Sequence, residues 1–399
     1  MKKYRIAYIP GDGINQAEDR WIWGGLGSYT KSWFLSGIPM QTKVALGTRS
    51  DYISNLALYR QVQRERFFDV SLADVQESSV SGYVDHDIFF TDWIRLNLGL
   101  RGDVFFVNVS NQLAPQSPDP NFVAVPITGN TNKGIASPKA NLVVSPLLNT
   151  DFYLNFGTGF HSNDARGVIL SQTSPAPASG TIPLLVRSIG TELGARTRQF
   201  DRLDLASALW LLDLDSELVF DADTGTSGSF SPEGATRRWG VDFEARYQVL
   251  DWLFLDYDLS WAQAFFRNTG DPVPLAPRIL QNGGVTARFQ NGLSAALRVR
   301  NLGPRPANEE DTLTAQGYTL LDLLGKYRWR NVELELAFLN ITNTKWRQAQ
   351  FANTSCLLGE TGTANCPTTP GQTPGAGNDD INFTPGNPFN VRGGVSVYF

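Results

Sequence analysis

Apolar and polar residues alternate with a period of two along much of the chain. In the clearest run, Asp242, Glu244, Arg246 and Gln248 are interleaved with Val241, Phe243, Ala245, Tyr247 and Val249. Similar runs lie at 293–300 and 332–338. Successive side chains of a strand point to opposite faces, so this period predicts strands with one apolar and one polar face. No stretch of the sequence has a helical period of comparable quality.

The predicted connections between strands are of two kinds. Short polar turns are expected at 91–92, 145–149, 200–201, 250–251, 290–291 and 330–331. Long segments rich in Pro, Gly, Asn, Ser and Thr lie at 111–133, 161–186, 222–233, 268–280, 304–315 and 344–389. Short and long connections alternate, which is typical of an antiparallel up-and-down transmembrane barrel with short periplasmic turns and long extracellular loops. A soluble sandwich has no physical reason to place every long loop at one end.

The pattern predicts fourteen strands, and residues 20–34 could add a fifteenth. The fourteen lie at 38–48, 75–90, 93–109, 134–146, 150–160, 187–199, 202–221, 234–249, 252–267, 281–290, 293–303, 316–328, 331–343 and 390–399. Several exceed the roughly 9–11 residues with which a tilted strand crosses a bilayer. Aromatic residues near the strand ends fit an interfacial girdle, although core aromatics of a sandwich would also explain them.

Composition narrows the class of protein. The 399 residues are 42% hydrophobic and 18% charged with a net charge of −5, so no basic surface is offered to nucleic acid. Mean hydropathy is −0.21, and no apolar run reaches the roughly 18 residues of a membrane helix. Two His and two Cys cannot build repeated zinc modules. We find no catalytic triad, paired-carboxylate site or phosphate loop, and therefore expect no enzyme activity, no cofactor and no metal.

The end of the chain carries a strand of its own. Val391, Val395, Val397 and Phe399 share one face, and the chain stops on the aromatic residue. This resembles the closing strand of bacterial outer-membrane barrels, which implies that Val395, Val397 and Phe399 act as a signal to the barrel-assembly machinery. The alternative is the last strand of a soluble sandwich.

Internal motifs resemble TonB-dependent outer-membrane receptors over roughly residues 20–399. They lie at 91–93 followed by 98–103, at 152–167, at 192–197 and at 338–343. The resemblance implies an outer-membrane barrel of 22 strands in contact with lipid, closed by a plug domain. It also implies uptake of a scarce small ligand, such as a siderophore, metal chelate, cobalamin or glycan, driven by a TonB complex.

The chain departs from that pattern in length. We find 14 or 15 of the expected strands and no plug domain, TonB-contacting segment or signal peptide, so residues 20–399 are expected to be the C-terminal part of a barrel in a truncated form. Residues 1–19 are a segment of uncertain origin, of which 1–14 resemble the start of isocitrate and isopropylmalate dehydrogenases. That family continues with Gly-x-Glu-Val, whereas this chain reads Asn15-Gln16-Ala17-Glu18. A passive porin-like channel and a soluble all-β binding protein are the alternative functions.

Three sets of residues are candidates for function. The first set lies where a strand enters a long loop and consists of His161, Asn163, Asp164 and Arg166. These residues are candidate contacts for ligand or plug, and the alternative is that they anchor the loop itself. Arg298 and Arg300 share the polar phase of their strand and are expected to face the lumen. Cys356 and Cys366 lie in one external loop, where an oxidising environment favours a disulfide. No second His or Cys near His161 supports a metal site.

Overall fold

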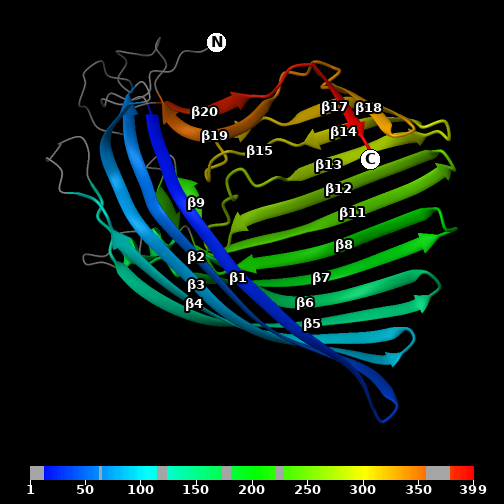
Figure 1. Cartoon of the computed structure of the whole chain (residues 1–399), viewed down its shortest axis with the longest axis horizontal. Coiled ribbons are helices and arrows are strands. Elements are labelled where there is room, and N and C mark those ends of the chain that lie inside the picture. Colours follow the sequence, from blue (N-terminus) through cyan, green and yellow to red (C-terminus); the bar gives the residue numbers. More distant parts are fainter. Residues whose placement is uncertain are drawn as a thin grey trace.

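One antiparallel sheet of fifteen strands makes up most of the molecule (Figure 1). The computed structural model describes residues 13–62, 65–114, 124–172, 181–216, 218–221, 229–232, 234–355 and 378–399. Each strand pairs with its neighbours in chain order. The strands are β1 (Gly13–Leu35), β2 (Ile38–Val62), β3 (Glu65–Thr91), β4 (Ile94–Asn111), β5 (Gly129–Leu147), β6 (Thr150–Ser162), β7 (Leu185–Gln199), β8 (Leu203–Leu214), β11 (Thr236–Leu250), β12 (Leu253–Phe266), β13 (Ile279–Arg288), β14 (Leu293–Leu302), β17 (Tyr318–Trp329), β18 (Val332–Leu339) and β21 (Asn390–Val397).

The sheet is curled into a wide trough rather than lying flat (Figure 1). Its two edges are β1 and β21, and within the described ranges each of these strands pairs with one neighbour only. The C-terminal end lies beside a short turn, because the backbone N–H of Tyr398 donates a hydrogen bond of 2.8 Å to the carbonyl of Asn331. The antiparallel order of the strands, the curvature of the sheet and its two open edges together show part of an antiparallel transmembrane β-barrel, as the alternating sequence predicts.

Tight turns join successive strands at one rim, which we call the short-turn side. The turns predicted near residues 92, 149, 201, 251, 291 and 331 are all present. A further turn at Ser36-Gly37 joins β1 to β2, and its φ angles of 51° and 85° are both positive. Two central residues with positive φ match the twist of a two-residue hairpin, which explains the glycine there.

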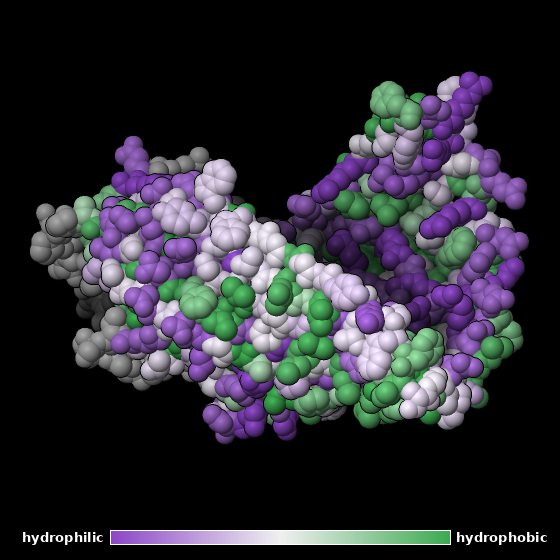
Figure 2. All heavy atoms as spheres, turned by 60° about the horizontal axis from the view of Figure 1, so that its bottom comes forward, coloured by the Kyte–Doolittle hydropathy of each residue, from purple (hydrophilic) through white to green (hydrophobic). Residues whose placement is uncertain are grey.

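Apolar and polar side chains are sorted onto the two faces of the sheet. On β14, Leu293 and Leu297 are exposed on the convex outer face, whereas Arg298 and Arg300 lie on the other face and pair with Asp256 and Asp322. In Figure 2 the hollow at the right is lined mainly by purple, hydrophilic residues, while green and white residues predominate on the surface below it. The outer face thus suits lipid and the inner face suits water.

The opposite rim, the long-loop side, carries small elements that the alternation did not predict. They are helix α1 (Ala165–Ser171) and the pairs β9 (Leu218–Asp221) with β10 (Ser229–Pro232), β15 (Arg305–Pro306) with β16 (Thr314–Ala315), and β19 (Arg347–Ser355) with β20 (Asn378–Pro385). In the described part of the chain, no helix is long and apolar enough to cross a membrane.

Helix α1 covers an apolar area of the inner face near this rim. Val168 and Ile169 of α1 are buried against Val75 of β3 and against Val107 and Val109 of β4. These wall residues are inward-facing and apolar because the helix, rather than water, packs against them. We call this group the α1 cluster.

Four predicted boundaries are wrong. Residues 49–62 and 65–74 were left outside the predicted strands, but they extend β2 and β3. The N-terminal segment was expected to end at residue 19, but β1 begins at Gly13 and pairs with β2 across that point. The strand predicted at 202–221 ends at Leu214, and β9 follows separately. Ladder hydrogen bonds with a long neighbour sustain a strand even where its side chains lose the alternation, as at the register shift between Ala17 and Asp19.

Candidate functional site

The inner face of the sheet is the candidate site because its polar side chains converge on cavities. A central cavity of 910 Å³ is lined from β3 to β11 by residues that include Asn97, Asn141, Asn155, Glu192 and Trp210. A second cavity of 560 Å³ lies by the short-turn side and is lined from β7 to β14. Cavities of this size hold small molecules in other proteins, where a few placed polar groups fix their orientation.

Amide and carboxylate groups form a row across the wall of the central cavity. Asn97, Asn141 and Asn155 are register partners on β4, β5 and β6. The Asn97 amide donates to Asp87 at 3.1 Å and accepts from the Asn141 amide at 3.0 Å. The Asn155 amide donates to Glu192 on β7 at 3.1 Å. The row uses part of the hydrogen-bonding capacity of each group, so lone pairs and N–H groups remain for a ligand or for water.

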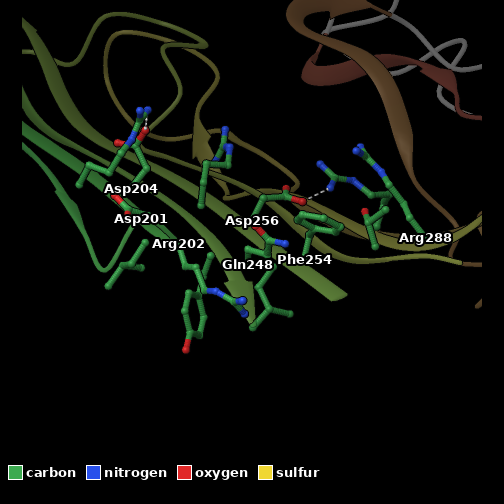
Figure 3. A pocket seen from close by; sticks show the side chains of 14 residues that line it. Asp201, Arg202, Asp204, Gln248, Phe254, Asp256 and Arg288 are labelled. Atoms are coloured by element: carbon green, nitrogen blue, oxygen red, sulfur yellow. Dashed lines mark hydrogen bonds and ion pairs between the residues drawn. The ribbon is translucent and has the colours of Figure 1, made fainter. Parts of the chain in front are cut away.

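The second cavity is lined by more arginines than aspartates, and we call it the arginine cavity. Five arginines line it against three aspartates (Figure 3): Arg198, Arg202, Arg246, Arg288 and Arg298 against Asp201, Asp204 and Asp256. Asp204 accepts from Arg196 at 2.9 Å and from Arg198 at 3.0 Å. Arg298 pairs with Asp256. Arg202 pairs with Asp251 at 2.8 Å and Arg246 with Asp258 at 2.9 Å, so the attraction for an anion depends on arginines that are left without a partner.

Arg288 differs from the other arginines that line this cavity. In the described residues its guanidinium has no carboxylate partner and lies 5.1 Å from the centre of the Phe254 ring. A stacked arginine keeps its N–H donors for another group while the ring holds its plane. Arg288 is thus the arginine of this cavity that is best placed to meet an anionic ligand.

The structure places the predicted pair Arg298 and Arg300 on the inner face, in two separate interactions. Arg298 pairs with Asp256 of β12, whereas Arg300 donates to Asp322 of β17 at 3.1 Å. The sequence interpretation did not identify these aspartates. Asp322 was recognisable as the single acid in the apolar run 320–324, where a buried charge needs a partner.

Asp322 also explains one of the sequence motifs. Its second carboxylate oxygen accepts from the backbone N–H of Asn340 at 2.8 Å. The Asn340 side chain then donates to the carbonyls of Thr344 and Asn387 and accepts from the backbone N–H of Thr344. Asn340 is buried and has a positive φ of 51°. This part of the 338–343 motif therefore ends β18 and ties its loop to the segment before β21.

The predicted cluster at the loop entrance is only partly assembled. Asp164 caps α1, accepting from the backbone N–H groups of Arg166 and Gly167, and its carboxylate pairs with the Arg166 side chain at 2.8 Å. Asn163 is buried and donates to the carbonyl of Pro183 at 2.7 Å. His161 stands apart on β6, in register with Val186. These contacts fit the alternative of a loop anchor, since the hydrogen bonds of Asn163 and Asp164 hold the loop and α1 in place.

Burial and charge act in opposite directions on Asp164. Burial would raise the pKa of its carboxyl, but the hydrogen bonds and the positive charge of Arg166 outweigh this, and the pKa lies below its ordinary value of 3.8. The carboxylate therefore stays ionised over the ordinary pH range and keeps its cap on α1.

The remaining candidates are placed as follows. Val395 and Val397 lie on the outer face of β21, opposite Leu334 and Val332 of β18, and Phe399 is fully exposed beyond the strand. Cys356 and Cys366 lie outside the described residues. Among the residues that are described, no three His, Cys, Asp or Glu side chains form a group that could hold a metal ion.

Comparisons with known proteins follow this geometry. A family model described as "TonB dependent receptor-like, beta-barrel" matches residues 7–343. Among solved structures, the ferric-catecholate import receptor Fiu of E. coli K12 matches with a TM-score of 0.70 at 16% identity, covering 96% of this chain and 55% of that one. The ferric yersiniabactin uptake receptor FyuA of Yersinia pestis gives 0.67 at 14%, covering 98% and 56%. The ferric citrate transporter FecA gives 0.71 at 15%, covering 96% and 55%.

The chain thus spans about half the length of the structures that it matches. At these identities the likeness shows a shared fold. None of these matches supports the resemblance of residues 1–14 to the dehydrogenases, and the family model itself begins at residue 7.

Proposed function

This chain belongs to the TonB-dependent receptor β-barrel family, and from that premise we propose that it forms the wall of an outer-membrane receptor for a ferric chelate. Uptake would be driven by a TonB complex on the short-turn side. The family has transporters and receptors rather than enzymes as its members, which agrees with the lack of a catalytic constellation in the sequence.

The observation that carries this proposal is the sorting of charge between the two faces. Lipid-facing positions such as Leu297 are apolar, while the adjacent inward positions hold paired arginines and aspartates around cavities. Such a wall suits transport of a charged ligand. An arginine N–H group that releases its aspartate can donate a hydrogen bond to the ligand instead. The three solved structures described above are named for ferric catecholate, ferric yersiniabactin and ferric citrate, which supports a ferric chelate over cobalamin or a glycan.

The arginine cavity is where we expect a negatively charged part of the ligand to be held. Arg288 would donate to it, while Arg298 could share its hydrogen bonds between Asp256 and the ligand. Barrel assembly through the terminal strand, with Val395, Val397 and Phe399 as its signal, belongs to the same proposal.

The test is uptake in the bacterium that encodes the chain. Loss of the gene should abolish accumulation of one radiolabelled ferric chelate, and loss of the TonB complex should do the same with the gene intact. Arg288→Gln should weaken binding of that chelate, whereas Arg237→Gln, which removes an arginine paired with Asp213 away from this cavity, should not. Accumulation that persists without TonB but requires the gene would show a passive channel and overturn the proposal.

A further inference from the structure

A short polar row interrupts the lipid-facing side of the sheet near its short-turn side. Lys31 on β1 is in register with Thr42 on β2, and Thr42 is in register with His86 on β3. The next partner across is Leu98, which is exposed on the outer face of β4. Since register partners share a face, Lys31, Thr42 and His86 face outward together.

Apolar rows lie on both sides of this polar row. Trp33, Met40 and Ile88 form the row nearer the turn, and Tyr29, Val44 and Val84 form the row on the other side. The lysine and the histidine are therefore set into an apolar surface. A charged group within such a surface is costly unless it reaches the headgroup layer or meets a partner.

The short-turn side is within reach of this row. Lys31 lies five positions before Ser36, the first residue of the turn. At ~3.3 Å per residue and a tilt near 45°, this places Lys31 about 12 Å from the turn, and the flexible lysine stem covers part of that distance. The ammonium group can thus extend to the level of lipid phosphates on this side.

Hydrogen bonds fix the orientation of the other two side chains. The indole Nε1–H of Trp33 donates to the Thr42 hydroxyl at 2.9 Å, and the Thr42 hydroxyl lies 2.9 Å from Nδ1 of His86. An indole N–H can only donate, so the hydroxyl accepts there and keeps its single hydrogen for Nδ1 of His86. In the tautomer that accepts this hydrogen bond, the histidine hydrogen is on Nε2, which leaves a donor on the same face as the lysine.

Among the described residues, no acidic side chain on this face pairs with the lysine. Asp85 and Asp87 flank His86 along β3, but they point to the inner face, where Lys139 and Asn97 bind them. Lys31 makes no ion pair with any residue that the structure describes. A cation on β1 and an N–H donor on β3 therefore share one outward-facing row, separated by Thr42 of β2, among aromatic and aliphatic side chains that suit acyl chains.

We propose that Lys31, His86 and Trp33 form a binding site for the phosphate of an anionic phospholipid in the leaflet on the short-turn side. Lys31 supplies the charge, His86 donates through Nε2, and Trp33 and Tyr29 contact the glycerol and the start of the acyl chains. The inference rests on the proposed membrane location of the receptor, and the ligand it concerns is a lipid rather than the transported solute.

The experiment is native mass spectrometry of the full chain extracted from membranes, titrated with phosphatidylglycerol and, separately, with phosphatidylcholine. Wild-type protein should prefer phosphatidylglycerol, and Lys31→Met should weaken that binding about fivefold, the effect of one lysine near an anionic lipid surface. The double variant Lys31→Met/His86→Leu should bind phosphatidylglycerol more weakly still. Lys43→Met is the matched control, because Lys43 follows Thr42 on the same strand and faces inward over Tyr83.

Equal binding of phosphatidylglycerol by wild type and Lys31→Met would overturn the proposal, as would equal affinity for the two lipids. Competition by free glycerol 3-phosphate as strong as by the lipid would show a soluble-anion site and would also overturn it. Heat-modifiable electrophoretic mobility shows that each variant is folded. Chelate uptake by the same variants separates this inference from the receptor function, since uptake can be absent while lipid preference remains.

Discussion

Two neighbouring residues of β14 show how differently the two faces of one strand are built. Leu297 is exposed on the outer face, while Arg298 faces the arginine cavity and pairs with Asp256. The backbone is the same at both positions, so the environment alone selects the side chain. The α1 cluster supports this explanation. Val75, Val107 and Val109 face inward but are apolar, because a helix rather than water covers them. The inner face is polar where water or ligand meets it.

The largest expected effect comes from placing one charge on either face of β14. Leu297→Arg should destabilise the folded barrel by about 2–4 kcal/mol, the cost of an arginine at the middle of the lipid-facing band. Ala296→Arg, one residue away on the inner face, should cost about 1 kcal/mol or less because the lumen is aqueous. Urea unfolding in vesicles measures both, and equal costs at the two positions would contradict the assignment of faces.

A charge within the α1 cluster should act locally. Val168 is fully buried, and Val168→Asp should undock α1 at a cost of about 2–3 kcal/mol, since the carboxylate has no partner there. Hydrogen exchange should rise at 165–171 and stay unchanged in β11–β14. Unchanged exchange in α1 would show that its docking does not depend on this apolar contact.

Replacing Asp322 tests whether a paired charge on the inner face also contributes to the stability of the fold. Asp322→Ala leaves the backbone N–H of Asn340 without its acceptor and Arg300 without its partner, so we expect a loss of about 1–3 kcal/mol. Asp251→Ala removes an exposed pair with Arg202 and should cost less than about 1 kcal/mol. Equal losses in urea unfolding would indicate that burial of Asp322 has no energetic consequence.

The smallest effect concerns the acid dependence of the α1 cap. The pKa of Asp164 is lowered in the folded chain, so its stabilisation is present above the ordinary value of 3.8 and is lost as pH falls through the lower folded value. The change should be about 1 kcal/mol or less. A spin label on α1 should gain mobility in that acidic range, and Asp164→Asn should remove the dependence. An unchanged acid response in that variant would assign it to another group.

The alternation predicted the fold class, the sheet and the short turns because each depends on local sequence. The turns near 201, 251 and 331 all follow from it. The full lengths of β2 and β3 could not be predicted this way, because Ser, Asn and Arg residues obscure the alternation in parts of these strands. Pairing with neighbouring strands keeps the backbone extended there. Elements within the long loops depend on contacts with distant strands, as α1 does with β3 and β4.

For the site, the alternation predicted which face Arg298 and Arg300 occupy but not which residues they pair with. Asp256 and Asp322 come from other strands, and only the register of the sheet brings them to these arginines. Arg288 and its contact with Phe254 were missed for the same reason. In contrast, the pairing of Asp164 with Arg166 was foreseeable because the two are close in sequence.

A membrane-spanning wall requires that alternate residues of β14 meet lipid. Spin labels placed singly at positions 294–300 of the chain in vesicles report accessibility to oxygen, which partitions into lipid, and to a water-soluble nickel complex. Positions 295, 297 and 299 should be reached by oxygen, and positions 294, 296, 298 and 300 by the nickel complex, as the register of β14 requires. Uniform access of the nickel complex to all seven positions, or the opposite phase, would contradict a membrane-spanning wall with a polar interior.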